Sequence, residues 1–302
     1  MDPRNRDYGV EWPTLALMVA TYAGWVTTTL YFDHMGPWVA VPLLALILTM
    51  HSSLQHEATH GHPLPSTRAS QAMVWPGVGL FIPFARFRDL HIAHHRDSNL
   101  TDPHDDPESN YFDPDHFYAL PAWWRVVLVF NNTLLGRFVL GPLVGMNGFY
   151  RTEIQRIRQG EPGVARAWIV HGLTLLPILA WLLAVSSTPL WAYVLAAYAA
   201  LSILKIRTFV EHQAHEMSSA RSVIIEDRGP LAFLFLNNNL HSVHHAHPQV
   251  AWYDLPMLYR QRRDEYLRRN RGYRFPSYLS VAARFLVRPK DPVPHPFLRR
   301  EG

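Results

Sequence analysis

The chain has 302 residues, of which 48% are hydrophobic, and it contains 18 His, 10 Trp and no Cys. The absence of Cys excludes disulfide frameworks, thiolate zinc sites, a catalytic thiol and an iron–sulfur cluster bound by this chain. The formal net charge is +4, but residues 256–302 carry twelve Arg or Lys and four Asp or Glu, which leaves a net −4 on residues 1–255. Because only the C-terminal segment carries a net positive charge, the overall charge does not indicate a nucleic-acid-binding protein.

Two long uncharged segments follow the N-terminus. No Asp, Glu, Lys or Arg occurs in the 21 residues 12–32 or in the 23 residues 34–56. A helix rises about 1.5 Å per residue, so about 20 such residues cross the hydrocarbon core of a bilayer. We therefore expect transmembrane helices over 12–32 and 37–56.

A third uncharged segment covers the 38 residues 167–204 and is interrupted by Ser-Ser-Thr-Pro at 186–189. This interruption predicts two spans, 167–185 and 190–210, joined by a tight turn. The alternative is that all four segments are buried helices of a soluble enzyme. Such helices normally carry a polar stripe, which these segments lack.

The positions of the basic residues predict the orientation in the membrane. All 28 Arg and Lys lie in residues 1–11, 61–166 and 205–302, and none lies in the turns at 33–37 and 186–189. Basic loops stay on the cytoplasmic side, so both termini and the central loop at 61–166 are expected to face the cytoplasm. The N-terminus has no small-residue cleavage signature, which makes the first span an anchor.

The expected fold is an all-α, multi-pass integral membrane protein, with residues 1–302 forming a single domain. Four transmembrane helices in two hairpins would carry a cytoplasmic helical cap made of residues 57–166 and 211–302. Within this cap, the interrupted apolar segments 69–85 and 123–150 are expected to lie along the membrane surface or beneath the cap.

Histidines cluster at the cytoplasmic ends of these spans. HEATH spaces two His by four residues, which places both on one helix face. In each of the two HxxHH motifs, the His at i and i+3 are expected to share a face, with the adjacent His on a neighbouring one. The clustered residues are His56 and His60; His91, His94 and His95; His212 and His215; and His241, His244 and His245.

This number of imidazoles indicates more than one metal ion. Eight or more neutral imidazoles exceed the four ligands of tetrahedral zinc and suit two metals with five or six ligands each. Imidazole ligands with open positions favour iron and oxygen chemistry, although copper and manganese accept the same ligand type. The sequence thus predicts a two-metal site below the membrane surface.

The order HEATH, HIAHH, HSVHH resembles the three histidine boxes of the membrane fatty acid desaturase superfamily. The segment NNNLHSVHHAHPQVAWYDLP is similar to the third box of bacterial acyl desaturases, and the resemblance extends from about residue 15 to 274. It implies two iron ions, O2 as co-substrate and a lipid acyl substrate. It also implies the metal ligands His56, His60, His91, His94, His95, His212, His241, His244 and His245.

Acidic and amide side chains beside the boxes are candidates for orienting these ligands. A metal-binding His usually donates its second ring N–H to a carboxylate or another acceptor. The candidates are Glu57, Asp97, Asp102, Asp106, Glu211 and Asn239. His62, His215 and His247 are additional to the box pattern and have no assigned role.

An unactivated C–H bond demands an oxidant, and fatty acid desaturation is the leading interpretation. A lipid or carotenoid hydroxylase or ketolase of the same superfamily is the alternative. A different class, a membrane zinc protease, would use HExxH at 56–60, but it leaves both HxxHH motifs unexplained. A metal transporter would place its ligands near the middle of the membrane instead of at the ends of the spans.

Electrons must come from outside the chain, which has no Cys and no HPGG motif of a fused cytochrome b5 domain. Small ferredoxin-like donors, supplied by a reductase, are commonly acidic. We expect such a donor to bind the basic residues after the third box, Arg260, Arg262, Arg263, Arg268 and Arg269. A topology signal and attachment to anionic lipid are the alternatives for this charge.

Overall fold

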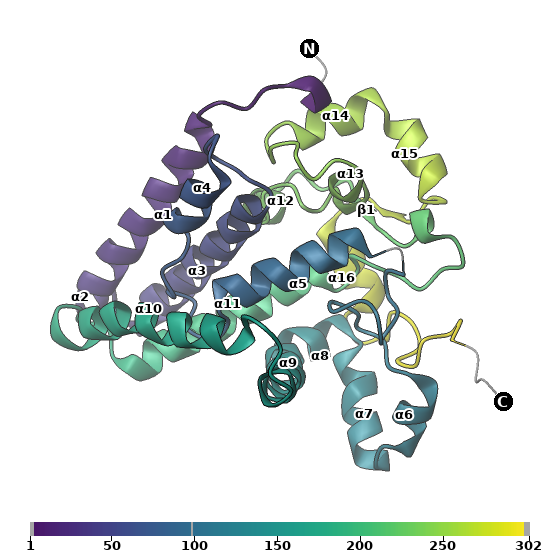
Figure 1. Ribbon diagram of the computed structural model, residues 1–302, viewed down its shortest axis with the longest axis horizontal. Coiled ribbons are helices and arrows are strands. Elements are labelled where there is room, and N and C mark those ends of the chain that lie inside the picture. The colour runs from purple at the N-terminus through teal and green to yellow at the C-terminus, as the bar shows by residue number, and fades with distance from the viewer. Residues whose placement is uncertain (1–2, 98, 299–302) are drawn as a thin grey trace. The chain divides into compact units, whose positions relative to one another are not determined.

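The structure, a computed structural model, describes residues 3–97 and 99–298 and is mostly helical (Figure 1). Within these residues, one two-stranded parallel sheet pairs β1 (Ile224–Ile225) with β2 (Arg274–Phe275). The predicted all-helical class is therefore correct except for this short pairing. A two-residue strand is too short for the alternation of polar and apolar residues that reveals a strand in a sequence.

The contacts of the chain divide it into two compact units. We call residues 7–89 and 145–204 the helical unit. The remaining described residues, 3–6, 90–144 and 205–298, form the unit that carries most of the clustered histidines, and we call it the histidine unit.

The helical unit contains the long apolar helices. Their positions follow the uncharged segments of the sequence, with short helices in the connections. The elements are α1 (Trp12–Leu30), α2 (Phe32–Met35), α3 (Pro37–Thr59), α4 (Thr67–Met73), α10 (Val164–Ala184) and most of α11 (Leu190–Thr208). Two further helices continue from one unit into the other, α5 (Phe84–Arg96) and α9 (Gly141–Arg158).

Within the described residues, three helices are long and apolar enough to cross a membrane, namely α3, α10 and α11. The expected first span is present as the 19-residue helix α1, but it is not one of these three. Five Thr reduce its hydropathy, and Thr14, Thr21, Thr28 and Thr29 are buried inside the protein.

Hydrogen bonds of buried polar groups tie α1 to the rest of the helical unit. Trp25 Nε1 donates to the Tyr193 hydroxyl at 2.7 Å, and this hydroxyl donates to the Val78 carbonyl at 2.7 Å. Both aromatic rings lie in an apolar core built from α1, α3, α10 and α11. At the turn after α2, Gly36 has φ +71°, a left-handed conformation that glycine adopts without strain.

The histidine unit is built mainly from short helices, one of which, α13, carries the third box, while the second box lies at the end of α5. Its elements are η1 (Pro3–Asn5), α6 (Pro114–Ala119), α7 (Ala122–Asn131), α8 (Leu134–Val139), η2 (Ser218–Ala220), α12 (Pro230–Leu234), α13 (His241–Ala246), α14 (Leu255–Gln261), α15 (Arg263–Arg269) and α16 (Tyr278–Phe285). An apolar core that includes Val243, Leu255 and Leu258 packs around α13 and fixes its position.

Candidate metal centre

Helices α5 and α13 each carry one HxxHH motif, and the histidines pair differently from the expected i, i+3 pattern. On α5 the ring centroids of His91 and His95 lie 4.5 Å apart, whereas those of His91 and His94 lie 6.0 Å apart. On α13 the distance from His241 is 4.5 Å to His245 and 6.0 Å to His244. The expected i, i+3 pairing was therefore wrong. At about 3.6 residues per turn, positions i and i+4 lie closer to the same face than i and i+3 do.

Four imidazoles of the histidine unit converge in what we call the second histidine group: His94, His212, His241 and His245. Nε2 of His212 lies 3.0 Å from Nε2 of His94 and 3.0 Å from Nε2 of His241. Nε2 of His245 lies 3.0 Å from Nε2 of His241. The same ring nitrogen of all four residues thus points to one centre.

This convergence fits a metal ion. A neutral imidazole has one lone-pair nitrogen, and several such lone pairs that face one another are unfavourable unless a cation lies between them. Two imidazole nitrogens about 2.1 Å from one metal and at right angles to each other would be about 3.0 Å apart, while a tetrahedral angle would give about 3.4 Å. The observed 3.0 Å spacing of the Nε2 atoms therefore suits a metal with more than four ligands.

The other three box histidines of this unit form the first histidine group: His91, His95 and His244. Nε2 of His244 lies 3.1 Å from Nε2 of His95. The ring centroids of His91 and His244 are 6.4 Å apart, and the two rings are nearly parallel. Each HxxHH motif therefore contributes to both groups, with two residues to one and a single residue to the other.

The first box lies in the helical unit, at the end of α3. His56 is the fourth-last residue of the helix and His60 caps its C-terminus. Their ring centroids are 4.9 Å apart, and both side chains are buried. Glu57 places Oε1 3.4 Å from Nδ1 of His56, so one of the expected orienting carboxylates lies beside the first box.

Carboxylate and amide groups contact the Nδ1 atoms on the far side of the converging rings. Oδ1 of Asp106 lies 2.7 Å from Nδ1 of His94, and both side chains are buried. Oε1 of Glu108 lies 2.9 Å from Nδ1 of His91. Oδ1 of Asn238 lies 3.0 Å from Nδ1 of His241. Each acceptor favours the tautomer with a proton on Nδ1, which leaves Nε2 free to bind a metal.

Burial and neighbouring charges shift the pKa values of the four histidines of the second group in different directions. Burial, and then the neighbouring imidazoles, lower the pKa of His212, His241 and His245 well below its usual value, so these rings are neutral. Burial also lowers the pKa of His94, but Glu108 and Asp106 outweigh it and raise that pKa to about 9. The two carboxylates thus stabilise positive charge on this ring, which is also the charge that a bound cation would introduce.

The acidic candidates of the loop after the second box lie in different environments. Asp106 contacts His94, whereas Oδ1 of Asp102 accepts the backbone N–H of His104 at 2.8 Å and thereby shapes the loop. Oδ1 of Asp97 accepts the backbone N–H of Asn99 at 2.7 Å. Sequence reasoning missed Glu108, which belongs to the same acidic loop and has no feature of spacing that distinguishes it from its neighbours.

The two candidates near the third box also differ. Oε1 of Glu211 lies 3.0 Å from Nε of Arg207, as an ion pair, and 3.7 Å from Nδ1 of His241. Asn239 donates to the Ile225 carbonyl at 2.7 Å and to the Asp227 carbonyl at 3.1 Å. The adjacent Asn238, which sequence reasoning missed, is the amide that contacts the His241 ring.

The additional histidines occupy separate positions. His62 forms a buried ion pair with Glu11 in the helical unit, between Nδ1 and Oε1. Nδ1 of His215 accepts the Met217 N–H at 2.9 Å. The His247 ring packs edge-on against Tyr266 at 6.2 Å. None of these three belongs to the histidine groups found among the described residues.

The basic residues expected to bind a partner lie on α14 and α15. Arg263 is engaged by Glu226, with Nε donating to Oε1 at 2.7 Å, and Arg262 contacts Glu265 at 3.4 Å. Arg268 and Arg269 are exposed at the end of α15, while Arg260 lines a cavity with Glu226 and Arg263.

Comparison with known protein families gives one match. The family model described as fatty acid desaturase matches residues 32–277, a segment that contains all three histidine boxes and His212. This match confirms the resemblance based on the boxes. No curated protein matches the chain.

Proposed function

Because the chain belongs to the fatty acid desaturase family, we propose that it is a membrane di-iron enzyme that desaturates a lipid acyl chain. Membership of the family makes it an oxidoreductase with a lipid substrate and membrane association. The observation that carries the proposal is the second histidine group, whose four ligand nitrogens lie within 4.8 Å of one another. Hydroxylation or ketolation of a lipid is the alternative outcome of the same chemistry.

We assign one iron to each histidine group. The second group supplies four imidazoles, and the first group supplies His91, His95 and His244. We propose His56 and His60 as further iron ligands on the family's first histidine box. Two irons bound there would supply, with O2 as co-substrate and two external electrons, the oxidising power to remove hydrogen from a methylene group.

The neighbouring side chains have an orienting function in this proposal. Asp106, Glu108 and Asn238 accept the Nδ1 protons of three box histidines and hold the rings with Nε2 toward the metal. Glu57 and Glu211 lie farther from Nδ1 of His56 and His241, at 3.4 and 3.7 Å. We infer that these two carboxylates act through charge more than through a direct hydrogen bond.

Metal analysis of the purified protein tests the assignment. We expect about two irons per chain, because seven histidines of the histidine unit form two groups. One tightly bound zinc would instead favour the HExxH protease, which accounts for His56 and His60 alone. Loosely held, exchangeable metal would favour a transporter.

Asp106→Asn should weaken iron binding and lower activity by about 10- to 100-fold, the usual effect of removing a group that orients a metal ligand. The buried carboxylate bonds to Nδ1 of His94 and stabilises charge on that ring, which a neutral amide does less well. The measurement is competition for iron with a chelator, together with turnover.

Asp102→Asn is the matched control, since it makes the same change in the same loop. Its carboxylate accepts backbone N–H groups of His104 and Asp105. Equal iron affinity in the two variants would refute the orienting role of Asp106.

We propose four spans, with α1 as the first, and an orientation that places both termini and the metal centre at the cytoplasmic face of the inner membrane. A reporter fused after Gly36 or Ser187 should then be external, and one fused after Pro107 or at the C-terminus should be cytoplasmic. The turns at 33–37 and 186–189 contain no Arg or Lys, which supports this orientation. A cytoplasmic reporter after Gly36 would put the first and third boxes on opposite sides of the membrane and contradict the proposed orientation.

We further propose that an acidic, ferredoxin-like donor binds the basic surface of α14 and α15. Arg268 and Arg269 are exposed, and residues 256–302 carry a net +8. Opposite charge accelerates encounter, and salt weakens this effect because it screens exposed charges.

Reversing Arg268 and Arg269 to Glu should slow donor-dependent turnover about tenfold or more at low salt and have little effect at high salt. Arg263 is a poorer choice for this test, because its reversal would break the bond to Glu226. Arg158→Glu, an exposed charge reversal in the helical unit, serves as the control. If turnover is insensitive both to the double reversal and to salt, the charge serves topology or lipid attachment instead.

A further inference from the structure

The C-terminal residues 287–297, which we call the strap, lie beyond the segment matched by the family model. The strap follows α16 and bonds along the histidine unit. Lys290 N donates to the Asn132 carbonyl at 3.0 Å, Phe112 N donates to the Val293 carbonyl at 3.0 Å, and His295 N donates to the Phe112 carbonyl at 2.8 Å. These backbone bonds hold the strap at Asn132, directly after α7, and at Phe112, shortly before α6.

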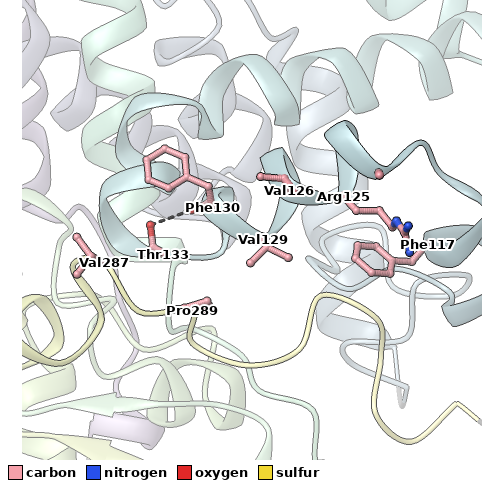
Figure 2. A pocket seen from close by; sticks show the side chains of 9 residues that line it. Phe117, Arg125, Val126, Val129, Phe130, Thr133, Val287 and Pro289 are labelled. Atoms are coloured by element: carbon pink, nitrogen blue, oxygen red, sulfur yellow. Dashed lines mark hydrogen bonds between the residues drawn. The ribbon is translucent and has the colours of Figure 1, made fainter.

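Figure 2 shows where the strap begins. Val287 and Pro289 face Val129, Phe130 and Thr133 across an apolar groove. Thr133 donates through Oγ1 to the Phe130 carbonyl at 2.8 Å, the bond drawn in the figure. Lys290 is therefore fixed from two sides. Val287 and Pro289 pack in the apolar groove before it, and the backbone bonds from Lys290 onward hold the rest of the strap.

Lys290 reaches from the strap to a residue of the second histidine group. Its Nζ donates to the His212 carbonyl at 2.5 Å, and its side chain is only 9% exposed. Oδ2 of Asp291 lies 3.3 Å from the same ammonium, which also lies 5.7 Å from the centre of the Tyr111 ring. The buried charge is thus paired and held in a fixed direction.

Tyr111 completes a clamp on the segment that follows α11. Its hydroxyl donates to Oδ2 of Asp291 and accepts the Ala214 N–H at 2.8 Å. Asn132 Nδ2 donates to the Asp291 carbonyl at 2.7 Å. The backbone is therefore held at two places, the carbonyl of His212 and the N–H of Ala214.

Such a clamp is needed because of where His212 lies. The other three members of the second group are on helices, His94 on α5 and His241 and His245 on α13. His212 follows the end of α11 at Thr208 and is in an irregular segment, with one isolated bridge to Ser222. Helical hydrogen bonds fix the backbone of three members, whereas that of His212 depends on contacts from elsewhere in the chain.

We propose that Lys290 is a positioning residue for the metal centre, which holds the backbone of His212 so that its imidazole stays within the second histidine group. The inference rests on the proposed function, in which His212 binds iron. The strap, which lies outside the matched segment, thereby supports His212, a proposed iron-binding residue inside it.

The test compares iron release from the purified, iron-loaded protein to a ferrous chelator. Lys290→Met keeps most of the aliphatic stem and removes the donor, and we expect about one of the two irons to leave about tenfold faster. Lys290→Arg keeps a charged hydrogen-bond donor, so its iron should leave nearly as slowly as from the unsubstituted protein. Arg288→Met removes an exposed positive charge two residues away and should behave as the unsubstituted protein.

Tyr111→Phe tests the same clamp with a smaller change. If Lys290→Met does not fold, this variant tests the positioning role in its place. The variant loses a buried hydroxyl that bonds to both Asp291 and Ala214, and we expect iron to be released about fivefold faster. A purely structural role would lower the thermal midpoint of either variant without changing the rate of iron release, and that result would overturn the proposal.

His212→Ala distinguishes failure of the proposed iron ligand His212 from failure of the positioning role of Lys290. If it retains both irons at the unsubstituted rate of release, then His212 is not a ligand and the proposed ligand set fails. If His212→Ala loses iron and the release rates of Lys290→Met and Tyr111→Phe are unchanged, the ligand set stands and the positioning role of Lys290 is disproved.

Discussion

We expect His241→Ala to lower activity by more than about a hundredfold, because even groups that only orient a metal ligand cost 10- to 100-fold. Nε2 of His241 lies 3.0 Å from Nε2 of both His212 and His245, so this ring is central to the second histidine group. Its removal takes away one ligand, and with it the nitrogen that lies 3.0 Å from Nε2 of His212 and of His245. The measurements are turnover and iron content of the membrane-inserted variant.

The same result is expected for alanine at each other histidine of the two groups and of the first box. His247→Ala is the matched control, because it lies six residues after His241 and packs on Tyr266 outside both groups. Unchanged activity in His241→Ala would show that the second group holds no metal that the reaction uses.

The second large effect concerns stability. Arg86→Met should lower the free energy of unfolding by about 3 to 5 kcal/mol, since it leaves a buried carboxylate without its charged partner. Arg86 donates to Glu153 through Nε at 2.6 Å and through Nη2 at 2.9 Å, and both side chains are less than a tenth exposed. Trp168 Nε1 donates to the same carboxylate at 3.0 Å, which is insufficient to balance its charge.

Two comparisons make this stability prediction specific. The double variant Arg86→Met with Glu153→Met should be less destabilised than Arg86→Met alone, because it removes both charges. Arg88→Met breaks a more exposed pair with Asp89 and should cost less than about 1 kcal/mol. Chemical denaturation in detergent micelles measures all three, and equal losses in the two single variants would contradict the prediction.

The long helices could be predicted because their physical cause is local. Uncharged segments of about 20 residues form helices wherever backbone polar groups must be satisfied within the segment, and α3, α10 and α11 follow from this. The short helices α7 and α8 could not be predicted individually. Their sequence is an interrupted apolar segment, and contacts with distant residues, such as the bond between Leu135 N and the Leu286 carbonyl, determine where each begins.

The sequence predicts the histidine motifs of the site, but it does not predict which residues each histidine contacts. Three boxes in order indicate metal binding, but spacing did not show that each HxxHH motif divides between two groups. Nor could it show that Glu108 and Asn238 contact box histidines while Asn239 bonds to backbone. Lys290 lies 78 residues from His212, so their contact depends on tertiary structure alone.

Lipid analysis tests the central claim most directly. Cells that contain the protein should accumulate acyl chains lighter by about 2 Da than those of cells with His241→Ala, as removal of two hydrogens requires. A gain of about 16 Da would show hydroxylation by the same centre and replace desaturation as the reaction. Identical lipids in both cell lines, with both proteins inserted in the membrane, would contradict the account of a lipid-oxidising enzyme.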